Sequence, residues 1–376
     1  MLRKTVLLAG ICLLAVTPAR ADLVADWLAG TAKTSTPAAT TTGAPMELKF
    51  GHPAPPVSLA IKPWQAAIAN VSKATGGMLS FKEFGAGTLI GPRDGFKAVR
   101  GGVAEWATCY VSYEGRGFEM TRVFEQPFVA LANPQVTARI AQELAPKYFA
   151  PEFERAGVVY STMGSFRPTD IMSKVPIRKW EDLAGLKVVA QGFPPAVAEA
   201  MGITLVNIPY PEVYVAMQQG TADAVIWVDA GFIPYKVFEV AKYHTTAALT
   251  GGGITHCYNK DWFAKLAPDL QAAFYAHQEP LGQALAKVTG NDFHITAAKT
   301  YADNGVEMIT LAPEEMRRWR EKLLPVVARW IEDNEKEGRP ARQLIADIET
   351  LAKKYGSMSP DELMGLALEQ PVMGIK

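Results

Sequence analysis

Short apolar segments of strand character alternate with helical segments along most of the 376-residue chain, and this alternation limits the possible folds more than any other feature. The expected strands cover residues 46–51, 79–84, 105–111, 158–163, 186–190, 204–208, 224–228 and 255–259. The expected helices cover residues 63–74, 94–101, 180–184, 195–201 and 211–219, with longer helical stretches near 268–303 and 313–354. This β-α-β rhythm predicts an α/β architecture, in which helices cover both faces of a parallel or mixed sheet.

The rhythm runs in two series, and this predicts two lobes with a cleft between them. Lobe I is expected to span residues 46–163 and to be completed by about 252–310. Lobe II is expected to span 164–251, with C-terminal helices of 311–376 packing across both lobes. Hydrophobic residues make up 49% of the chain, which is enough to bury a large core.

The N-terminus has the three parts of an export signal. Arg3 and Lys4 form a positive end, residues 6–16 form a short apolar run, and Ala19 and Ala21 supply the small residues of a cleavage site. The run is too short to span a bilayer, and the alternative is a buried N-terminal helix. We expect a signal peptide over residues 1–21, cleaved after Ala21, and export to a bacterial periplasm.

Residues 22–45 are rich in Thr, Ala and Pro. A stretch of this composition buries too little apolar surface to offset the entropy lost on ordering it. We therefore expect a flexible leader before the first strand.

Two cysteines remain after cleavage, Cys109 and Cys257. An oxidising compartment would allow them to form a disulfide. Buried free thiols are the other possibility and the one that we expect, because free cysteines are among the most buried residues.

Charge and motifs exclude several classes of protein. With 38 basic and 38 acidic residues the formal net charge is zero, which argues against a nucleic-acid-binding protein, because such a protein would show a basic excess or stripe. The glycines at 85–91 lack dinucleotide-binding spacing, and the glycines at 251–253 lack the Lys-Ser/Thr of a phosphate-binding loop. The chain has no Gly-x-Ser-x-Gly or His-Glu-x-x-His motif. Export, two lobes and no catalytic motif favour a binding protein over an enzyme, and no cofactor is expected.

Several segments, in order along the chain, match one family. They are residues 48–52 (LKFGH), 75–79 (TGGML), 84–91 (FGAGTLIG), 180–187 (WEDLAGLK), 212–224 (EVYVAMQQGTADA), 238–243 (FEVAKY) and 259–263 (NKDWF). From about residue 48 to about residue 354 the chain resembles the solute-binding proteins of TRAP (tripartite ATP-independent periplasmic) transporters, in their dicarboxylate-binding-protein-like branch.

The resemblance implies a two-lobe periplasmic solute-binding protein fold with an interlobe ligand cleft and a long bracing helix. It also implies capture of one small solute, typically an organic acid, and its delivery to TRAP-type membrane permease subunits driven by an ion gradient.

Arg167 lies where the family places one ligand arginine, and a planar guanidinium can pair bidentately with a carboxylate. The family's second arginine is replaced by Val189. Side chains two residues apart share one face of a strand, so Val189 and Gln191 are expected to face the cleft. Lys187 lies about 7 Å back along the strand, too far to substitute.

The family's Gln-Glu-Asn segment reads VIWVD at 225–229. Its Trp-Val pair is similar to the branch that binds 2-oxo acids with a metal ion, but Ile226 replaces that branch's acidic ligand, so no metal is expected. Trp227 is expected to form an apolar wall of the cleft, unless it is a core tryptophan. Asp229 is expected to accept a hydrogen bond from the ligand or to pair with Arg167. The remaining candidates are Tyr110, Tyr113, Phe193 and His256.

We therefore expect a receptor for a carboxylate held by Arg167, with an apolar or aromatic part against Trp227 and Val189. Because the second arginine is missing, a neutral, hydroxylated or aromatic solute stays possible. A periplasmic sensor that presents its solute to a signalling protein is an alternative. A secreted enzyme using Asp229, His256 or His52 as acid and base is a further one.

Overall fold

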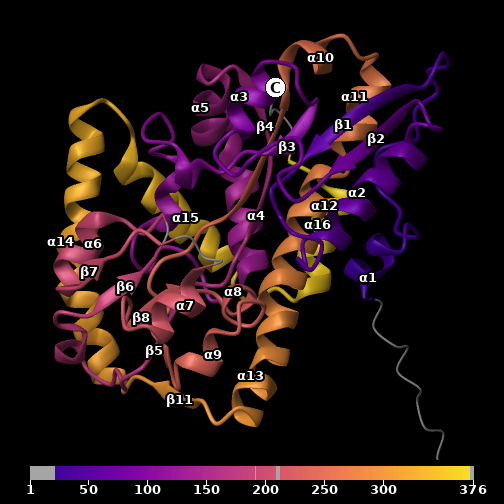
Figure 1. Ribbon diagram of the computed structural model, residues 1–376. Coiled ribbons are helices and arrows are strands. Elements are labelled where there is room, and N and C mark those ends of the chain that lie inside the picture. The colour runs from indigo at the N-terminus through magenta and orange to yellow at the C-terminus, as the bar shows by residue number, and fades with distance from the viewer. Residues whose placement is uncertain (1–21, 191, 209–211, 373–376) are drawn as a thin grey trace, which may run out of the picture.

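The structure, a computed structural model, describes residues 22–190, 192–208 and 212–372, and these residues form two α/β lobes (Figure 1). Each lobe is built on one sheet of mixed strand direction. The two-lobe α/β fold expected from the strand–helix rhythm is confirmed. The expected signal peptide lies outside the described residues.

The sheet of lobe I has the strand order β2-β1-β3-β10-β4. Its strands are β1 (Met46–Gly51), β2 (Leu79–Phe84), β3 (Trp106–Thr108), β4 (Val158–Ser165) and β10 (Gly253–Asn259). β1 runs parallel to β2 and β3, whereas β10 runs antiparallel to β3 and β4. Because β10 lies between strands from much earlier in the chain, lobe I is completed only after the chain has returned from lobe II.

The sheet of lobe II has the strand order β11-β9-β5-β8-β6-β7. Its strands are β5 (Asp170–Ser173), β6 (Lys187–Val189), β7 (Thr204–Leu205), β8 (Ala224–Trp227), β9 (Tyr243–Thr246) and β11 (Glu307–Thr310). β5 runs antiparallel to β8 and β9, and β6 runs parallel to β7 and β8. The strand ends at β6 and β8 lead directly into the cleft between the lobes.

Amphipathic helices cover the sheet of lobe I. In α2 the side chains of Trp64, Ala67 and Val71 recur at helical spacing and are buried, and this helix packs on β2. The other helices of this lobe are α1 (Leu23–Leu28), α3 (Gly95–Arg100), α4 (Pro134–Leu144), α5 (Ala150–Arg155), α10 (Lys260–Ala264), α11 (Pro268–Tyr275) and α12 (Gln278–Leu285), beside α2 (Ile61–Ala74). α4, α5 and α12 all pack against β4, so this strand is buried along its whole length.

The helices of lobe II are shorter. They are α6 (Pro195–Met201), α7 (Val213–Gln218), α8 (Asp229–Phe232), α9 (Val237–Val240) and α13 (Phe293–Asp303). Ala297 and Tyr301 of α13 belong to the core of this lobe, and β11 pairs with β9. The expectation that residues up to about 310 complete lobe I is therefore wrong for α13 and β11. α13 belongs to lobe II because Ala297 and Tyr301 pack in its core, and β11 belongs to it because it extends the sheet beside β9.

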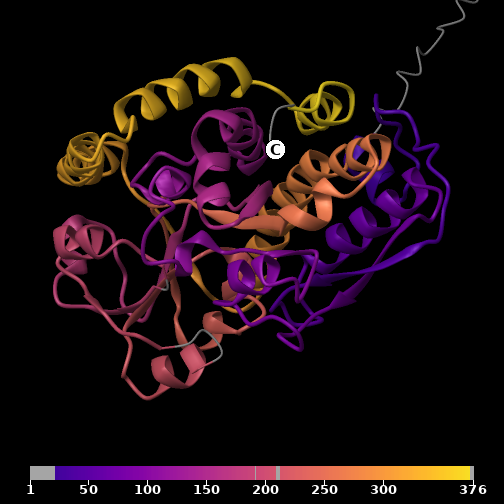
Figure 2. The ribbon, with the colours of Figure 1, turned by 90° about the horizontal axis from the view of Figure 1, so that it is seen from above.

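The C-terminal helices reach from one lobe to the other. They are α14 (Pro313–Lys336), α15 (Ala341–Tyr355) and α16 (Pro360–Glu369). Trp319 and Leu323 of α14 are buried in lobe II, whereas Leu344 of α15 and Leu363 of α16 are buried in lobe I. Figure 2 shows these helices along one side of the molecule, with α15 between the two ends.

A second helical connection runs inside the molecule. α12 packs on β4 of lobe I, and α13 packs against α8 of lobe II. Between them the helix widens into the π-helical segment η6 (Ala286–Asp292). Figure 1 shows α11, α12 and α13 as an orange column that passes from one lobe to the other.

Residues 22–45 are packed onto lobe I, so the expected flexible leader is wrong. Val24 and Trp27 of α1 are each only 1% exposed. The indole Nε1 of Trp27 donates a hydrogen bond to Nδ1 of His277 over 3.3 Å, and Asn70 donates to the Trp27 carbonyl over 2.9 Å. The average composition of residues 22–45 did not indicate this packing. Two large apolar side chains, Val24 and Trp27, are enough to anchor the short helix α1 on lobe I.

Cys109 and Cys257 form a disulfide, and the expectation of free thiols is wrong. Cys109 follows β3 and Cys257 lies in β10, and the two strands are neighbours in the sheet. The cysteines are separated by 148 residues, so their proximity follows from the sheet order and not from any local pattern. The bond fixes the segment that follows β3 to the neighbouring strand β10.

None of the helices in the described part of the chain combines the length and the apolar character that crossing a membrane requires.

Candidate functional site in the interlobe cleft

Two segments cross between the lobes side by side and form the floor of the cleft. One is residues 165–169, which joins β4 to β5, and the other is residues 250–253, which joins β9 to β10. The backbone N–H of Phe166 donates to the Gly252 carbonyl over 3.0 Å, and that of Thr169 donates to the Thr250 carbonyl over 2.8 Å. The hydroxyl groups of Thr169 and Thr250 also lie 3.1 Å apart. This pairing holds the side chains of both segments in fixed positions.

The cleft has two adjoining compartments that share the side chains of Tyr110, Phe166, Trp227 and Val228. The first has a volume of about 280 Å³, and we call it the polar compartment because Ser112, Glu125, Arg167, Thr169 and Thr250 line it. The second has a volume of about 380 Å³, and we call it the apolar compartment. Its lining includes Leu59, Trp64, Ala230, Tyr235 and Ile254.

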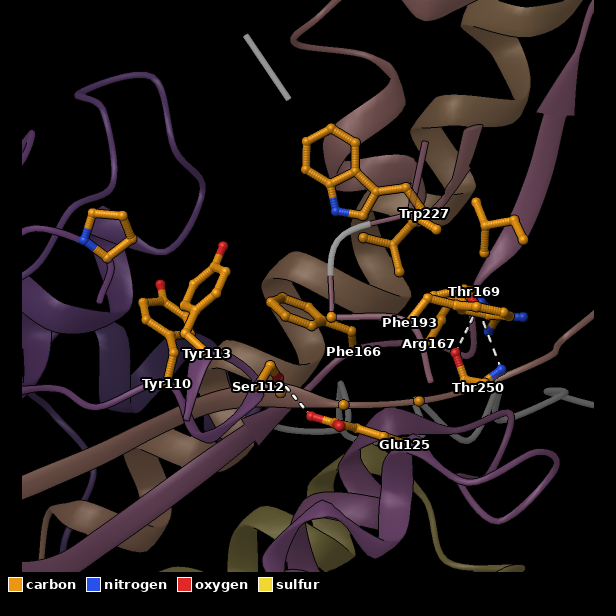
Figure 3. Close-up of a pocket in the computed structure, with 18 of the residues that line it drawn as sticks. Tyr110, Ser112, Tyr113, Glu125, Phe166, Arg167, Thr169, Phe193, Trp227 and Thr250 are labelled. Atoms are coloured by element: carbon orange, nitrogen blue, oxygen red, sulfur yellow. Dashed lines mark hydrogen bonds between the residues drawn. The ribbon is translucent and has the colours of Figure 1, made fainter. Parts of the chain in front are cut away.

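Arg167 brings a positive charge to the polar compartment. Its Nη1 donates a hydrogen bond to the Ala132 carbonyl over 3.1 Å, and this contact fixes one side of the guanidinium. No ion pair joins it to a carboxylate anywhere in the described ranges. Figure 3 shows Arg167 beside Thr169 and Thr250, with Phe166 between it and the two tyrosines. A half-buried arginine that is not ion-paired within the protein is suited to an anionic ligand.

Glu125 lies in the same compartment, but its charge is matched by the protein. The Ser112 hydroxyl donates to Oε1 over 2.6 Å, and Arg122 Nε donates to Oε2 over 2.6 Å. Burial raises the pKa of Glu125, although the neighbouring Arg122 opposes this rise. The Arg122–Glu125 pair is close to neutral overall, so Arg167 keeps the excess positive charge in the compartment.

Aromatic rings form the walls of the cleft. The rings of Tyr110 and Tyr113 meet edge to face at 5.9 Å between centroids, and those of Trp227 and Tyr235 stack at 5.4 Å. Burial raises the pKa of both Tyr110 and Tyr113, so both phenols stay protonated and can donate hydrogen bonds. Phe166, on the crossing segment of residues 165–169, lines both compartments (Figure 3). Such walls favour a ligand with a flat or apolar part.

Of the residues singled out in the sequence, five line the polar compartment. They are Tyr110, Tyr113, Arg167, Phe193 and Trp227. Gln191 lies outside the described residues.

Val189 and His256 were expected in the cleft but lie in the cores of the lobes. Val189 is fully buried in the core of lobe II, with Met172 and Val225. His256 is fully buried in lobe I, where its Nε2 accepts a hydrogen bond from Trp64 Nε1 over 2.8 Å. Burial lowers the pKa of His256 to about 3. Both expectations are wrong because each side chain takes the face of its strand that helices cover.

Asp229 lies just beyond the cleft, and it does not form the expected pair with Arg167. Its Oδ2 contacts His294 Nδ1 over 2.5 Å, and its Oδ1 accepts a hydrogen bond from the Tyr301 hydroxyl over 2.7 Å. His244 Nε2 lies 3.3 Å from Oδ1. Burial would raise the pKa of Asp229, but His244 and His294 outweigh burial and hold this pKa well below its usual range. The carboxylate therefore ties β9 and α13 to the start of α8, directly behind Trp227.

Sequence reasoning missed several residues of the polar compartment. They are Ser112, Glu125, Phe166, Thr169, Thr250 and the glycines at 251–253. The triple glycine was the one available signal. A Cβ atom at Gly251 would lie 2.1 Å from Ala130 Cβ, and one at Gly253 would lie 2.5 Å from the Gly164 carbonyl oxygen. The run thus marks close backbone packing at the crossing.

No group of three or more His, Cys, Asp or Glu side chains is arranged to hold a metal ion within residues 22–190, 192–208 and 212–372.

Comparison with known proteins gives a consistent result. The family profile of the bacterial extracellular solute-binding proteins, family 7 (DctP), matches residues 50–334. The C4-dicarboxylate-binding periplasmic protein DctP of Rhodobacter capsulatus is 23% identical over 289 residues, which cover 75% of this chain and 85% of the relative.

Solved structures share the fold. A TRAP periplasmic solute-binding protein from Desulfovibrio salexigens, with the C-terminus of a symmetry mate in its ligand-binding site, superposes with a TM-score of 0.76 at 22% identity, over 84% of this chain and 98% of that chain. A TRAP solute-binding protein from Rhodoferax ferrireducens, in complex with copurified benzoate, gives a TM-score of 0.74 at 23% identity, over 83% and 98%. The chain therefore belongs to the bacterial extracellular solute-binding proteins of family 7, a family of solute receptors, and its resemblance to the receptors of TRAP transporters is confirmed.

Proposed function

We propose that this protein is the periplasmic receptor that captures a small carboxylate with an aromatic or apolar part and delivers it to TRAP-type membrane permease subunits. The observation that carries the proposal is Arg167. It lines an aromatic-walled compartment, and no carboxylate of the described residues is ion-paired with it.

The charges of the compartment support one bound carboxylate. A hydrogen bond to a charged group contributes roughly 1.5–3 kcal/mol, about twice the usual neutral contribution. Arg122 neutralises Glu125, so the negative charge of Glu125 is not free to repel the ligand. The hydroxyl groups of Thr169 and Thr250, beside Arg167, can hydrogen-bond the same carboxylate.

Relatives bind ligands of this chemistry. The structure from Rhodoferax ferrireducens holds benzoate, and that from Desulfovibrio salexigens holds a C-terminus. Both ligands offer a carboxylate. The aromatic walls at Tyr110, Phe166 and Trp227 suit the ring of an aromatic acid in this chain.

The structure gives no support to the enzyme alternative. His52, Asp229 and His256 were the candidate acid–base residues, and none of the three lines either compartment. His52 is fully buried, its Nε2 lies 2.9 Å from Oε1 of the partly exposed Glu83, and burial lowers the pKa of His52.

Export agrees with the chemistry of the cysteines. A disulfide between Cys109 and Cys257 persists in an oxidising compartment such as the periplasm. This supports a periplasmic location, with a signal peptide over residues 1–21 that is cleaved after Ala21.

The test is ligand binding by protein purified from the periplasm, with benzoate and succinate as probes. We expect benzoate to bind by calorimetry and, at a hundredfold excess over Kd, to stabilise the fold by about 2.7 kcal/mol. Arg167→Ala should weaken benzoate binding about ten- to a hundredfold. Arg167→Lys should retain only part of the affinity, because an ammonium group cannot pair bidentately.

Arg178→Ala is the matched control, because Arg178 forms an exposed ion pair with Glu307 on the outer face of lobe II. It should leave binding unchanged. Equal benzoate affinity in the wild type and the Arg167→Ala variant would overturn the carboxylate site. Tight binding of a neutral compound by both proteins would replace it with a neutral-solute receptor.

A further inference from the structure

We propose that the apolar compartment receives the far end of the ligand, so that the solute is an elongated monocarboxylate with an aryl or alkyl end. This inference rests on the proposed function, because the carboxylate is placed at Arg167. The two compartments adjoin, because the side chains of Tyr110, Phe166, Trp227 and Val228 line both of them. A ligand anchored at Arg167 can therefore extend past Trp227 without leaving the cleft.

The lining of the apolar compartment has no charged side chain among the described residues. Its walls are Ala54, Pro55, Val57, Ser58, Leu59, Ala60, Trp64, Ala230, Gly231, Pro234, Tyr235, Ile254 and Thr289, beside the shared side chains. Trp64 offers it no donor, because its single N–H is bound to His256. A second carboxylate in this compartment would lose its hydration and find no cation, which is strongly unfavourable. The site thus selects against an elongated dicarboxylate.

Gly231 leaves room for the Trp227 indole, which forms part of the wall shared by the two compartments. A Cβ atom at this position would lie only 2.2 Å from Cδ2 of Trp227, so no larger residue lets the indole lie where it does. The Trp227 indole also stacks on the Tyr235 ring, and this second contact helps to fix the position of the indole. The indole therefore presents one surface to both compartments, and it can contact the ring and the chain of a single ligand.

The volumes agree with a ligand larger than benzoate. Small-molecule sites of proteins are typically about 300–1,000 Å³. The polar compartment alone, at about 280 Å³, is slightly smaller than this range, and the apolar compartment adds about 380 Å³. At the rim Val57 is 75% exposed, a large apolar side chain placed where the end of such a ligand would cover it.

The experiment is calorimetric titration of the wild type with benzoate, phenylacetate, 3-phenylpropanoate and 4-phenylbutanoate. Each buried methylene should tighten binding about fourfold. Succinate should bind more weakly than any of the four. A flat or falling series, with benzoate binding still lost in Arg167→Ala, would overturn the apolar extension and leave the proposed function standing. Failure of every carboxylate to bind would overturn the proposed function itself.

Two variants locate the far end of the ligand. Ala230 lines only the apolar compartment and Ala190 only the polar one, so Ala230→Phe and Ala190→Phe are a matched pair. Ala230→Phe should keep benzoate affinity within about twofold but abolish the gain with chain length. Ala190→Phe should weaken all four ligands. An unchanged chain-length series in Ala230→Phe would place the end of the ligand elsewhere, and circular dichroism checks that both variants fold.

Discussion

At the scale of single residues, His244 of lobe II is a buried histidine whose protonation is favoured by two neighbouring carboxylates, those of Asp170 and Asp229. It is fully buried between Asp229, at 3.3 Å, and Asp170, at 4.0 Å, and its ring packs on Tyr301. Burial would lower its pKa, but the two carboxylates outweigh burial and raise it. The charged form of His244 therefore holds β9 to the carboxylate that lies behind the cleft.

The pKa of His244 is higher in the folded than in the unfolded protein, and this fixes the sign of the pH dependence. The stabilising charge is fully present below the unfolded pKa of about 6.5 and is lost as the pH rises through the folded pKa. We expect His244→Gln to lower the free energy of unfolding by about 1.5–3 kcal/mol at pH 6. The deficit should shrink steadily towards pH 9, as measured by urea denaturation across this range.

His256→Gln provides a control of opposite slope. The folded pKa of His256, about 3, is below the unfolded value of 6.5. The stability that neutral His256 contributes to the folded protein is thus fully present above pH 6.5 and is lost as the pH falls towards 3. The wild type should lose stability relative to this variant on acidification. A pH-independent difference between the wild type and His244→Gln would show that His244 is neutral in the folded protein.

The candidate site could be predicted only in part from the sequence. Arg167 and Trp227 were found because they occupy positions that the family uses for its ligand or its pocket wall. The strand pattern wrongly predicted that Val189 and His256 face the cleft. Alternation shows which side chains share a face of a strand, but it does not show which of the two faces lines the cleft. Glu125 carried no local signal, since its place in the compartment depends on the fold around Arg122 and Ser112.

At the scale of elements, the disulfide between Cys109 and Cys257 closes a loop that contains lobe II except for α13 and β11. Removing a cross-link destabilises a protein mainly by freeing its unfolded chain, typically by about 2–4 kcal/mol. We expect the double variant Cys109→Ser/Cys257→Ser to lose stability by this amount in urea denaturation. A reducing agent should lower the stability of the wild type and leave the double variant unchanged. Two alkylatable thiols in the untreated wild type would contradict the bond.

The elements themselves were predictable where a long apolar pattern marked them. β1 and β2 begin and end where the pattern indicated, and so does α6. β5, β9 and β11 were missed, because each has four residues and two of them, YHTT and EMIT, have no apolar alternation. These strands form only because the sheet of lobe II supplies partners on their edges. Tertiary contacts decide such segments, and sequence periodicity does not.

At the scale of the whole molecule, function depends on how the two lobes meet. Three connections join them near the cleft: the two paired crossing segments and the helical column from α12 to α13. A ligand that contacts both lobes favours the arrangement in which its contacts are complete, and only this differential affinity can shift the lobes. Arg167 lies where the connections converge, because it is on one crossing segment and packs beside Gly290 of η6.

A substitution at Gly290 tests whether the packing of these connections positions Arg167. A Cβ atom there would lie 2.6 Å from Pro134 Cγ of α4 and 3.8 Å from Arg167 Cγ. We expect Gly290→Ala to destabilise the fold by about 1–3 kcal/mol through overpacking. Arg167 donates to the Ala132 carbonyl, two residues before α4, so displacing Pro134 should shift the guanidinium, and benzoate affinity should fall about tenfold. Small-angle X-ray scattering with and without benzoate should show a smaller ligand-induced compaction than in the wild type.

Gly365→Ala is the matched control, because its Cβ would meet only Leu23 Cδ1 at 3.6 Å, within an ordinary helix. It should stabilise the fold by about 0.5–1 kcal/mol and leave binding and compaction unchanged. The two substitutions add the same methyl group, one where the lobes are joined and one on the far side of lobe I. If both variants bound benzoate like the wild type, the packing at Gly290 would not contribute to ligand binding. The ligand would then close the lobes through the crossing segments alone.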